Sequence, residues 1–383
     1  MEIYLDNSAT TRVKKEIVDG VIKILTENYG NPSSLHHKGV EAEKILNYSR
    51  DMVARILKCD RDDKIYFTSG GTESNNLAIR GYLKANKHKG NHIITTAIEH
   101  PSVMNTFLDM KKQGYKVDIL PVDPMGYINT EDLKSMVTDE TALISVMMVN
   151  NEIGTIEPIK EISAIAKEKG AILHVDAVQA YGKLDFGVKD YGIDMLSVSG
   201  HKIHGLKGSG VLYVDKNIKL LPILTGGGQE MNVRSGTENV PGIYALGKAS
   251  ELLLGKIEEN ARYLYKLKGK FVEELNDLEG WSINGPGLNE AAPHIINISF
   301  SGIRGEVLVH ALEEYGIYVS TGSACSSKRN SESSVLKAIG LKPNALKGVI
   351  RVSFSILNTE EEIVKAADAI KETVPELRKY TRG

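Results

Sequence analysis

The sequence has few cysteines and no long apolar stretch, and both absences exclude classes of protein. Cys59 and Cys325 are the only cysteines among 383 residues, so a disulfide framework or a cysteine-based metal cluster within one chain is excluded. Neither a span of about 20 apolar residues nor a secretory leader is recognisable, and we expect a cytoplasmic protein that does not enter a membrane. The net charge of −2 provides no basic surface for direct contact with nucleic acid.

What the chain does contain is typical of a globular protein of more than one domain. It is 42% hydrophobic and 25% charged, and its length predicts two or three domains. Short β-type runs alternate with helical periods between residues 65 and 199, which predicts a mostly parallel sheet covered by helices on both faces. One long helical region is expected over about 243–276. Shorter elements after residue 281 indicate a smaller α+β domain.

Lys202 is the first candidate for chemistry. It follows Ser197-Val198-Ser199-Gly200-His201, a short run that we interpret as a strand ending at an exposed sheet edge. A lysine in a partly desolvated cleft has a lowered pKa and can hold an aldehyde as a Schiff base. Taken alone, the motif is more often an ordinary surface lysine at the end of a strand.

A second segment changes this balance. Asp176 and Gln179 follow the apolar run Ala171-Ile172-Leu173 and also lie at a predicted strand end. Pyridoxal phosphate needs a carboxylate beside its pyridine nitrogen, and Gln179 can donate a hydrogen bond to its phenolate oxygen. A lone aspartate here would be interpreted as a helix N-cap or turn residue. The two segments together predict a pyridoxal phosphate site.

Further polar motifs lie at predicted strand ends. Gly71 and Thr72 belong to a glycine-rich turn that opens a helix and can bind an anion such as phosphate, although a plain capped turn explains the same pattern. His100 lies between a strand and a helix, where it can stack on a planar ring or serve a structural purpose. No carboxylate pattern near the histidine clusters completes a metal site, so no metal is predicted.

The two cysteines have different surroundings. Cys325 lies in the small, polar segment 320–334, which we expect to be an exposed, mobile loop. Lys328 and Arg329 favour its thiolate form, although an incidental surface cysteine is the alternative. Cys59 follows an amphipathic helical run and is expected to be half-buried and inert.

The ordered set of motifs resembles that of cysteine desulfurases of the NifS/IscS family, which belong to the class V aminotransferase group of fold-type I pyridoxal phosphate enzymes. The resemblance covers almost the whole chain and is carried by seven segments: residues 4–11, 68–76, 149–154, 174–179, 199–202, 234–237 and 323–325. It implies an α/β fold with a large cofactor-binding domain, residues 15–257, built on a mostly parallel seven-stranded-type sheet. Residues 1–14 and 258–383 would form the small α+β domain that carries Cys325.

The resemblance also implies roles for individual residues. Catalysis would be carried by Lys202 as the cofactor lysine, His100 as the stacking residue and proton shuttle, and Cys325. The cofactor would be held by Lys202, Gly71, Thr72, His100, Asn151, Asp176, Gln179, Ser199, His201 and, from the neighbouring subunit of a homodimer, Thr237. The substrate would be bound by Arg351, Asn31 and Asn151.

The implied reaction removes sulfur from L-cysteine, giving L-alanine and a persulfide on Cys325. An acceptor protein, either an iron–sulfur scaffold or a tRNA-thiolation protein, would then take the sulfur. Three alternatives stay open. A class V aminotransferase would form a keto acid and would not need Cys325, a selenocysteine lyase would share nearly all site residues, and a non-catalytic interaction module would bind no cofactor.

Overall fold

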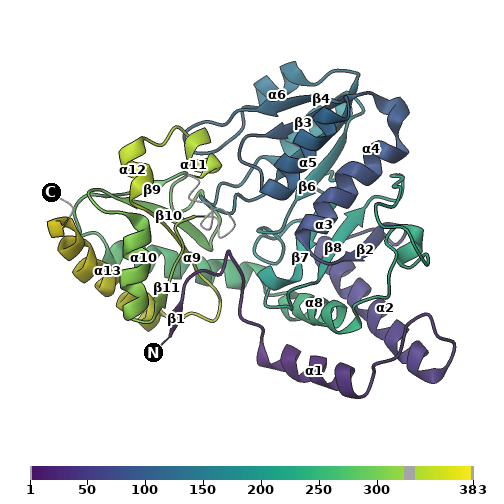
Figure 1. Cartoon of the computed structure of the whole chain (residues 1–383), viewed down its shortest axis with the longest axis horizontal. Helices are drawn as coiled ribbons and strands as arrows, with labels where there is room; N and C mark the ends of the chain where they lie inside the picture. The colour runs from purple at the N-terminus through teal and green to yellow at the C-terminus, as the bar shows by residue number, and fades with distance from the viewer. Residues whose placement is uncertain (1, 323–332, 381–383) are drawn as a thin grey trace.

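The computed structural model describes residues 2–322 and 333–380, and its largest element is a seven-stranded sheet. This sheet occupies the right-hand part of the view in Figure 1. In spatial order its strands are β2 (Lys64–Thr68), β8 (Gly210–Val214), β7 (Met195–Ser199), β6 (Ile172–Asp176), β5 (Thr141–Met147), β3 (His92–Thr96) and β4 (Lys116–Leu120).

Six of these strands run in the same direction, so their carboxyl ends lie along one edge of the sheet. The pairs from β4 through β7 are parallel, whereas β8 is antiparallel to both β7 and β2. The α/β class with a mostly parallel sheet is therefore confirmed. Strand β8 begins at the last glycine of the segment Lys207-Gly208-Ser209-Gly210. Gly210 lets this strand approach Gly70 closely, because a Cβ atom there would lie 2.5 Å from the Gly70 Cα.

Helices surround the large sheet. They are α1 (Lys15–Thr26), α2 (His37–Leu57), α3 (Gly71–Asn76), α4 (Tyr82–Ala85), α5 (Pro101–Lys112), α6 (Thr130–Met136), α7 (Ile159–Glu168) and α8 (Val240–Leu253). The π-helical turn η1 (Leu77–Gly81) joins α3 to α4, and the 3₁₀ turns η2 (Lys87–Lys89), η3 (Gly200–Lys202) and η4 (Glu230–Asn232) lie in connections. Helix α8 packs along both α1 and α2.

A second hydrophobic core lies around a smaller antiparallel sheet, at the left of Figure 1. Its strands, in order, are β12 (Val349–Ser353), β10 (Ile295–Phe300) and β9 (Trp281–Asn284). Around it lie the helices α9 (Ile257–Glu274), α10 (Gly305–Glu314), α11 (Ser334–Ala338), α12 (Pro343–Lys347) and α13 (Glu360–Tyr380). The amino-terminal strand β1 (Ile3–Tyr4) pairs with β11 (Ile317–Tyr318), so the amino-terminal segment packs against this part of the molecule. The domain boundaries 15–257 and 258–383 stay a prediction.

The long helical region expected over 243–276 is instead two helices, α8 and α9. Gly255, in the connection between them, has φ +70°, a left-handed conformation that ends the first helix and that glycine adopts without strain. Apolar periodicity alone did not reveal the break, because apolar residues continue on both sides of it. None of the helices in the part of the chain that the structure describes is long and apolar enough to cross a bilayer.

Candidate active site

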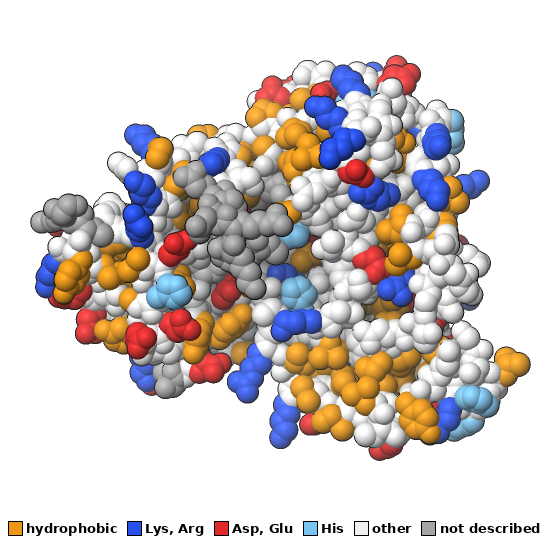
Figure 2. Space-filling view, viewed as in Figure 1, with side chains coloured by type: hydrophobic (Ala, Val, Ile, Leu, Met, Phe, Trp, Pro, Cys, Tyr) orange, Lys and Arg blue, Asp and Glu red, His pale blue; other side chains and the backbone are white. Residues whose placement is uncertain are grey.

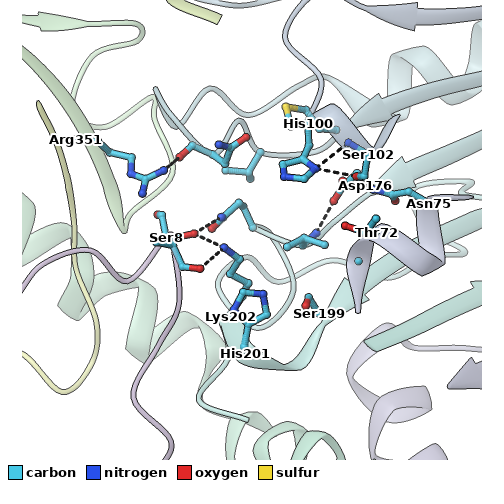
Figure 3. Close-up of a pocket in the computed structure, with 17 residues that line it drawn as sticks. Ser8, Thr72, Asn75, His100, Ser102, Asp176, Ser199, His201, Lys202 and Arg351 are labelled. Carbon is cyan, nitrogen blue, oxygen red and sulfur yellow. Dashed lines mark hydrogen bonds between the residues drawn. The ribbon is translucent and has the colours of Figure 1, made fainter. Parts of the chain in front are cut away.

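A pocket of about 250 Å³ lies at the carboxyl edge of the large sheet (Figure 3). Segments far apart in the sequence form its wall, from the amino-terminal stretch to strand β12. Ten residues named from the sequence line it: Gly71, Thr72, His100, Asn151, Asp176, Gln179, Ser199, His201, Lys202 and Arg351. The wall also contains Ser8, Ala9, Asn75, Ser102, Met147, Val149 and Val178, which sequence reasoning did not single out. The structure shows that these residues line one cavity. Their roles in binding and catalysis stay predictions.

Lys202 is held at the end of the turn η3, directly after strand β7. Its Nζ donates hydrogen bonds to the backbone carbonyls of Ser8 and Ala9, the latter at 2.8 Å. Lys183, which is buried behind it, donates from Nζ to the Lys202 carbonyl oxygen at 2.8 Å. Burial, together with the charge of Lys202, lowers the pKa of Lys183 to about 7. The hydrogen bond from Lys183 therefore holds the backbone of Lys202, whose side chain lines the pocket.

Asp176 ends strand β6 and is oriented by hydrogen bonds to both carboxylate oxygens. Asn75 Nδ2 donates to Asp176 Oδ2 at 2.7 Å, and the Val178 N–H donates to Oδ1 at 3.0 Å. Asn75 Nδ2 also donates to Ser102 Oγ at 2.8 Å. Ser102 Oγ lies 2.8 Å from His100 Nδ1. The Asn75 amide and the Ser102 hydroxyl thus link the carboxylate of Asp176 to His100.

His100 caps helix α5 and lines the pocket as a neutral ring. The Ser102 N–H donates to His100 Nδ1 at 3.1 Å, so Nδ1 is an acceptor and the ring proton is on Nε2. Burial lowers the pKa of His100, and the charge of Lys202 acts in the same direction while Asp176 opposes it. A neutral, planar ring with an N–H donor is suited to stacking and to transferring a proton.

The turn after strand β2 forms the part of the wall that suits an anion. Gly71 begins α3, and the first N–H groups of a helix have no acceptor within it. A Cβ atom on Gly71 would lie 2.7 Å from Val178 Cγ2, so a side chain would not fit where this backbone passes. Thr72, Ser199 and His201 are on the same side of the pocket in Figure 3. Burial and nearby lysines lower the pKa of His201 to about 4, which leaves its ring neutral.

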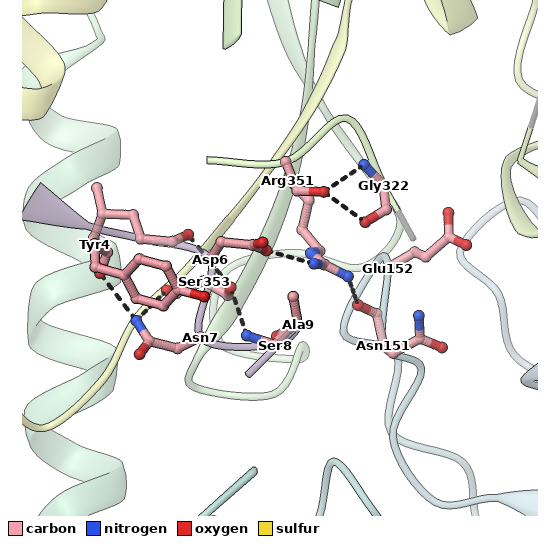
Figure 4. Close-up of polar contacts among 12 residues, drawn as sticks. Tyr4, Asp6, Asn7, Ser8, Ala9, Asn151, Glu152, Gly322, Arg351 and Ser353 are labelled. Atoms are coloured by element: carbon pink, nitrogen blue, oxygen red, sulfur yellow. Dashed lines mark hydrogen bonds and ion pairs between the residues drawn. The ribbon is translucent and has the colours of Figure 1, made fainter. Parts of the chain in front are cut away.

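Arg351, on strand β12, closes the opposite side of the site (Figure 4). The residue is 1% exposed and forms an ion pair with Asp6, with 2.6 Å between Nη2 and Oδ1. Its Nη1 donates to the Asn151 carbonyl at 2.9 Å, and among the described residues its buried Nε has no acceptor. Burial raises the pKa of Asp6, and the arginine opposes that shift. Asp6 was missed, since its place in the sequence gives no sign of a partner at position 351.

Cys325, the predicted sulfur acceptor, lies outside the described residues. Gly322 and Ser333, the described residues that flank this part of the chain, both lie beside Glu152. Ser333 Oγ donates to Glu152 Oε2 at 2.5 Å, and a Cβ atom on Gly322 would lie 3.3 Å from the same oxygen. Glu152 directly follows Asn151, which lines the pocket. The described flanks therefore approach the site from its Arg351 side.

Two predicted residues lie away from the pocket of this chain. Asn31 is in the exposed connection between α1 and α2, where its Oδ1 accepts a hydrogen bond from the Ser33 N–H at 2.9 Å. Thr237 is exposed on the loop before α8. The expectation for Cys59 is confirmed. Its thiol is half-buried, and burial together with Asp63 raises its pKa to about 12.

Comparison with known proteins gives one consistent result. The family model of class-V aminotransferases matches residues 3–365. A protein named cysteine desulfurase IscS from Methanosarcina thermophila is 46% identical over 98% of this chain and 93% of its own length. A solved structure titled NifS-like protein superposes with a TM-score of 0.92 at 38% identity, covering 98% of this chain and all of the other. Another, titled SspA in complex with cysteine, has a TM-score of 0.80 at 33% identity and covers 92% of this chain and 98% of the other.

Matches of this identity and coverage establish the family, and the pocket residues lie on the fold that the family shares. This chain therefore belongs to the NifS/IscS family of cysteine desulfurases, within the class-V aminotransferases.

Proposed function

We propose that this protein removes sulfur from L-cysteine with the help of pyridoxal phosphate and transfers the sulfur to Cys325. The observation that carries the proposal is the convergence of Lys202, Asp176 and an anion-binding turn on one pocket. The family relationship and the structural neighbour whose title names bound cysteine support it.

The residues of the pocket fit pyridoxal phosphate. The cofactor has three groups that need a partner. Its aldehyde needs an amine, which Lys202 provides, and its pyridine nitrogen needs a carboxylate, which Asp176 provides in a fixed orientation. Its phosphate needs the free N–H groups of a helix start, and α3 starts at Gly71, where no side chain would fit. When bound, the cofactor supplies an aldehyde and an electron-withdrawing ring. We assign the phosphate to Gly71, Thr72, Ser199, His201 and the partner subunit's Thr237, and the ring to His100, Asn151, Asp176 and Gln179.

Each remaining group of the chain has a separate task in this mechanism. Arg351 binds the substrate carboxylate, for which its guanidinium is geometrically suited, and Asn151 assists. Asn31 is exposed and lies away from the pocket of its own chain, so its proposed contact with the substrate would form only in the homodimer. Lys202 Nζ, in its neutral form, takes the proton from the substrate Cα, and His100 Nε2–H supplies or returns protons nearby. Asp176 keeps a negative charge opposite the pyridine nitrogen.

Sulfur transfer is the step assigned to Cys325. Its thiolate attacks the sulfur of the substrate cysteine, so that an S–S bond forms as the Cβ–S bond breaks. The electron pair of the broken bond stays with the substrate carbon, which takes up a proton and leaves as L-alanine. A persulfide remains on Cys325, and an acceptor protein for iron–sulfur cluster assembly or tRNA thiolation removes its outer sulfur.

The proposal includes a homodimer in the cytoplasm. Helix α1, the start of α2 and the connection between them carry exposed apolar side chains that no described residue covers, and Figure 2 shows an apolar patch at the lower right of the molecule, where these elements lie in Figure 1. The side chains are Val18, Ile22, Leu25, Tyr29, Leu35 and Val40, with exposed fractions from 38% to 100%. A second copy of the chain is the occupant that would also supply Thr237. A reducing compartment suits a reaction that needs a free thiolate.

The test compares the wild-type protein with Cys325→Ala. Both are incubated with L-cysteine and a reductant, and alanine and sulfide are measured together. We expect equal amounts of the two products from the wild type, and at least a 100-fold loss in a variant that still shows the visible absorbance of bound cofactor. Keto acid formation by both proteins would indicate an aminotransferase, and absence of cofactor would indicate an interaction module. A strong preference for selenocysteine would indicate a lyase for that amino acid.

A further inference from the structure

Gln179 has both ends of its side-chain amide engaged by buried partners. Its Nε2 donates to the Ser8 carbonyl oxygen at 3.0 Å, and its Oε1 lies 3.2 Å from Nε2 of His294. A backbone carbonyl can only accept, so the contact with Ser8 requires the NH₂ end of the amide at that position. The amide oxygen must then face His294. One N–H of Gln179 is used by Ser8, and the other is available to a ligand in the pocket that Gln179 lines.

This orientation determines the tautomer of His294. An amide oxygen is an acceptor, so His294 must donate, which places its ring proton on Nε2. Its Nδ1 is buried and has no partner among the described residues, which agrees with a ring nitrogen that carries no proton. The side chain is fully buried, at 0% exposed.

The backbone that carries His294 is fixed from several elements. The His294 carbonyl oxygen accepts from the Phe354 N–H at 2.9 Å. Two residues earlier, the Ala292 N–H donates to the Gly154 carbonyl at 2.7 Å, and the Ala292 carbonyl accepts from Lys268 Nζ at 2.9 Å. A side chain mounted on such a segment keeps its direction, which is what a positioning residue needs.

The surrounding charges keep this ring neutral. Burial lowers the pKa of His294 well below its usual value, and the charges of Lys183, Lys268, Arg351 and Lys202 act in the same direction. Among the described residues, no carboxylate forms an ion pair with the His294 ring. The ring is therefore neutral, with Nδ1 unprotonated, and Nε2 carries the proton that it donates to Gln179.

We propose that His294 is a positioning residue that holds the amide of Gln179 with its N–H donor toward the cofactor. The inference rests on the proposed function, because it needs pyridoxal phosphate in the pocket. His294 does not touch the cavity. It acts through Gln179, because without its Nε2–H only the Ser8 carbonyl holds the amide, and the side chain is less firmly kept with its second N–H toward the ring oxygen of the cofactor.

The test is the pH at which the visible absorbance of the bound cofactor changes, measured in the holoenzyme without substrate. A donor facing the ring oxygen stabilises negative charge there and keeps the proton affinity of the chromophore low. We expect His294→Leu to move the midpoint upward by about 0.5–1 pH unit. His294→Gln, whose Nε2 can reach the same oxygen, should restore a midpoint close to that of the wild type.

A double-variant cycle separates positioning from a direct effect. In a Gln179→Ala background, His294→Leu should leave the midpoint where Gln179→Ala alone places it. An equal shift in both backgrounds would overturn the proposal, because His294 would then act by its own field. Failure of His294→Gln to restore the midpoint would overturn it as well.

Nitrogen NMR of the ¹⁵N-histidine-labelled wild-type holoenzyme provides a second measurement that does not depend on the folding of His294→Leu. We expect the His294 ring to be neutral with its proton on Nε2, and a proton on Nδ1 would overturn the inference. A wild-type protein that binds no pyridoxal phosphate removes the proposed function and this inference with it. A coloured wild type whose midpoint is indifferent to His294 overturns only the inference.

Discussion

At the scale of single residues, Arg351 is the side chain whose environment constrains function most. A buried guanidinium is costly unless it is paired, and here Asp6 and the Asn151 carbonyl engage two of its nitrogens. Its Nε is buried and has no acceptor among the described residues. The same ion pair fixes the direction of the fork, so that binding a substrate carboxylate requires little reorganisation.

We predict that Arg351→Lys raises KM for L-cysteine about 10- to 100-fold, because a lysine cannot reproduce bidentate hydrogen bonding to a carboxylate. Steady-state kinetics of alanine formation measure the effect. L-cysteine methyl ester is the matched control, since it lacks the carboxylate and its kcat/KM should differ little between the two proteins. An equal loss on acid and ester would mean that Arg351 is needed for the fold and not for the carboxylate.

At the scale of elements, the turn η4 is the most strained part of the described chain. Glu230, Met231 and Asn232 have φ values of 45°, 56° and 65°, a left-handed region that L-residues other than glycine rarely adopt in succession. The buried Glu230 carboxylate stabilises the turn by accepting from the Phe67 N–H at 2.8 Å and from Arg50 Nη2 at 2.9 Å. These contacts hold the backbone of η4 in one conformation, and with it the start of the loop that leads to Thr237.

Glu230→Gln should lower the free energy of unfolding by about 2–3 kcal/mol. The loss is smaller than for a fully buried pair because Arg50 is 26% exposed. Met231→Gly is the matched control, since glycine accepts the left-handed conformation and should raise stability by up to about 1 kcal/mol. Urea unfolding of both variants measures these changes. A stabilising Glu230→Gln would show that the ion pair does not hold the turn.

At the scale of the whole molecule, the exposed apolar face of α1 is the feature that a monomer does not explain. Ile22 and Leu25 are 54% and 60% exposed on it. We predict that Ile22→Glu with Leu25→Glu weakens self-association at least about 100-fold, because each copy loses the burial of two large side chains and gains two charges. Sedimentation velocity measures the association constant.

The matched control for the α1 face is Val307→Glu, which adds a charge at a 45% exposed apolar residue on α10. It should leave self-association unchanged. Cofactor affinity provides a second readout, because a monomer would lack the partner subunit's Thr237. Dimers that persist in the double variant would place the interface on another face of the molecule.

The sequence was most informative where a motif ends a strand. Lys202, Asp176 and His100 follow three different strands, and parallel strands bring their carboxyl ends to one edge, so local patterns predicted a shared site. It was least informative for partners from distant segments. Asp6 is 345 residues from Arg351, and His294 is 115 from Gln179. Neither pairing has a local signal.

By itself, the sequence determined the class of fold, the family and the set of polar residues at strand ends, because these depend on local periodicity and on motifs with fixed spacing. The tertiary structure alone decided how the amino-terminal segment and β12 close around the pocket, and how His294, just before β10, comes to lie against Gln179. It also decided which atoms act as donors. The orientations of Gln179 and His294 follow from contacts across the interior, where each buried polar atom must find a partner.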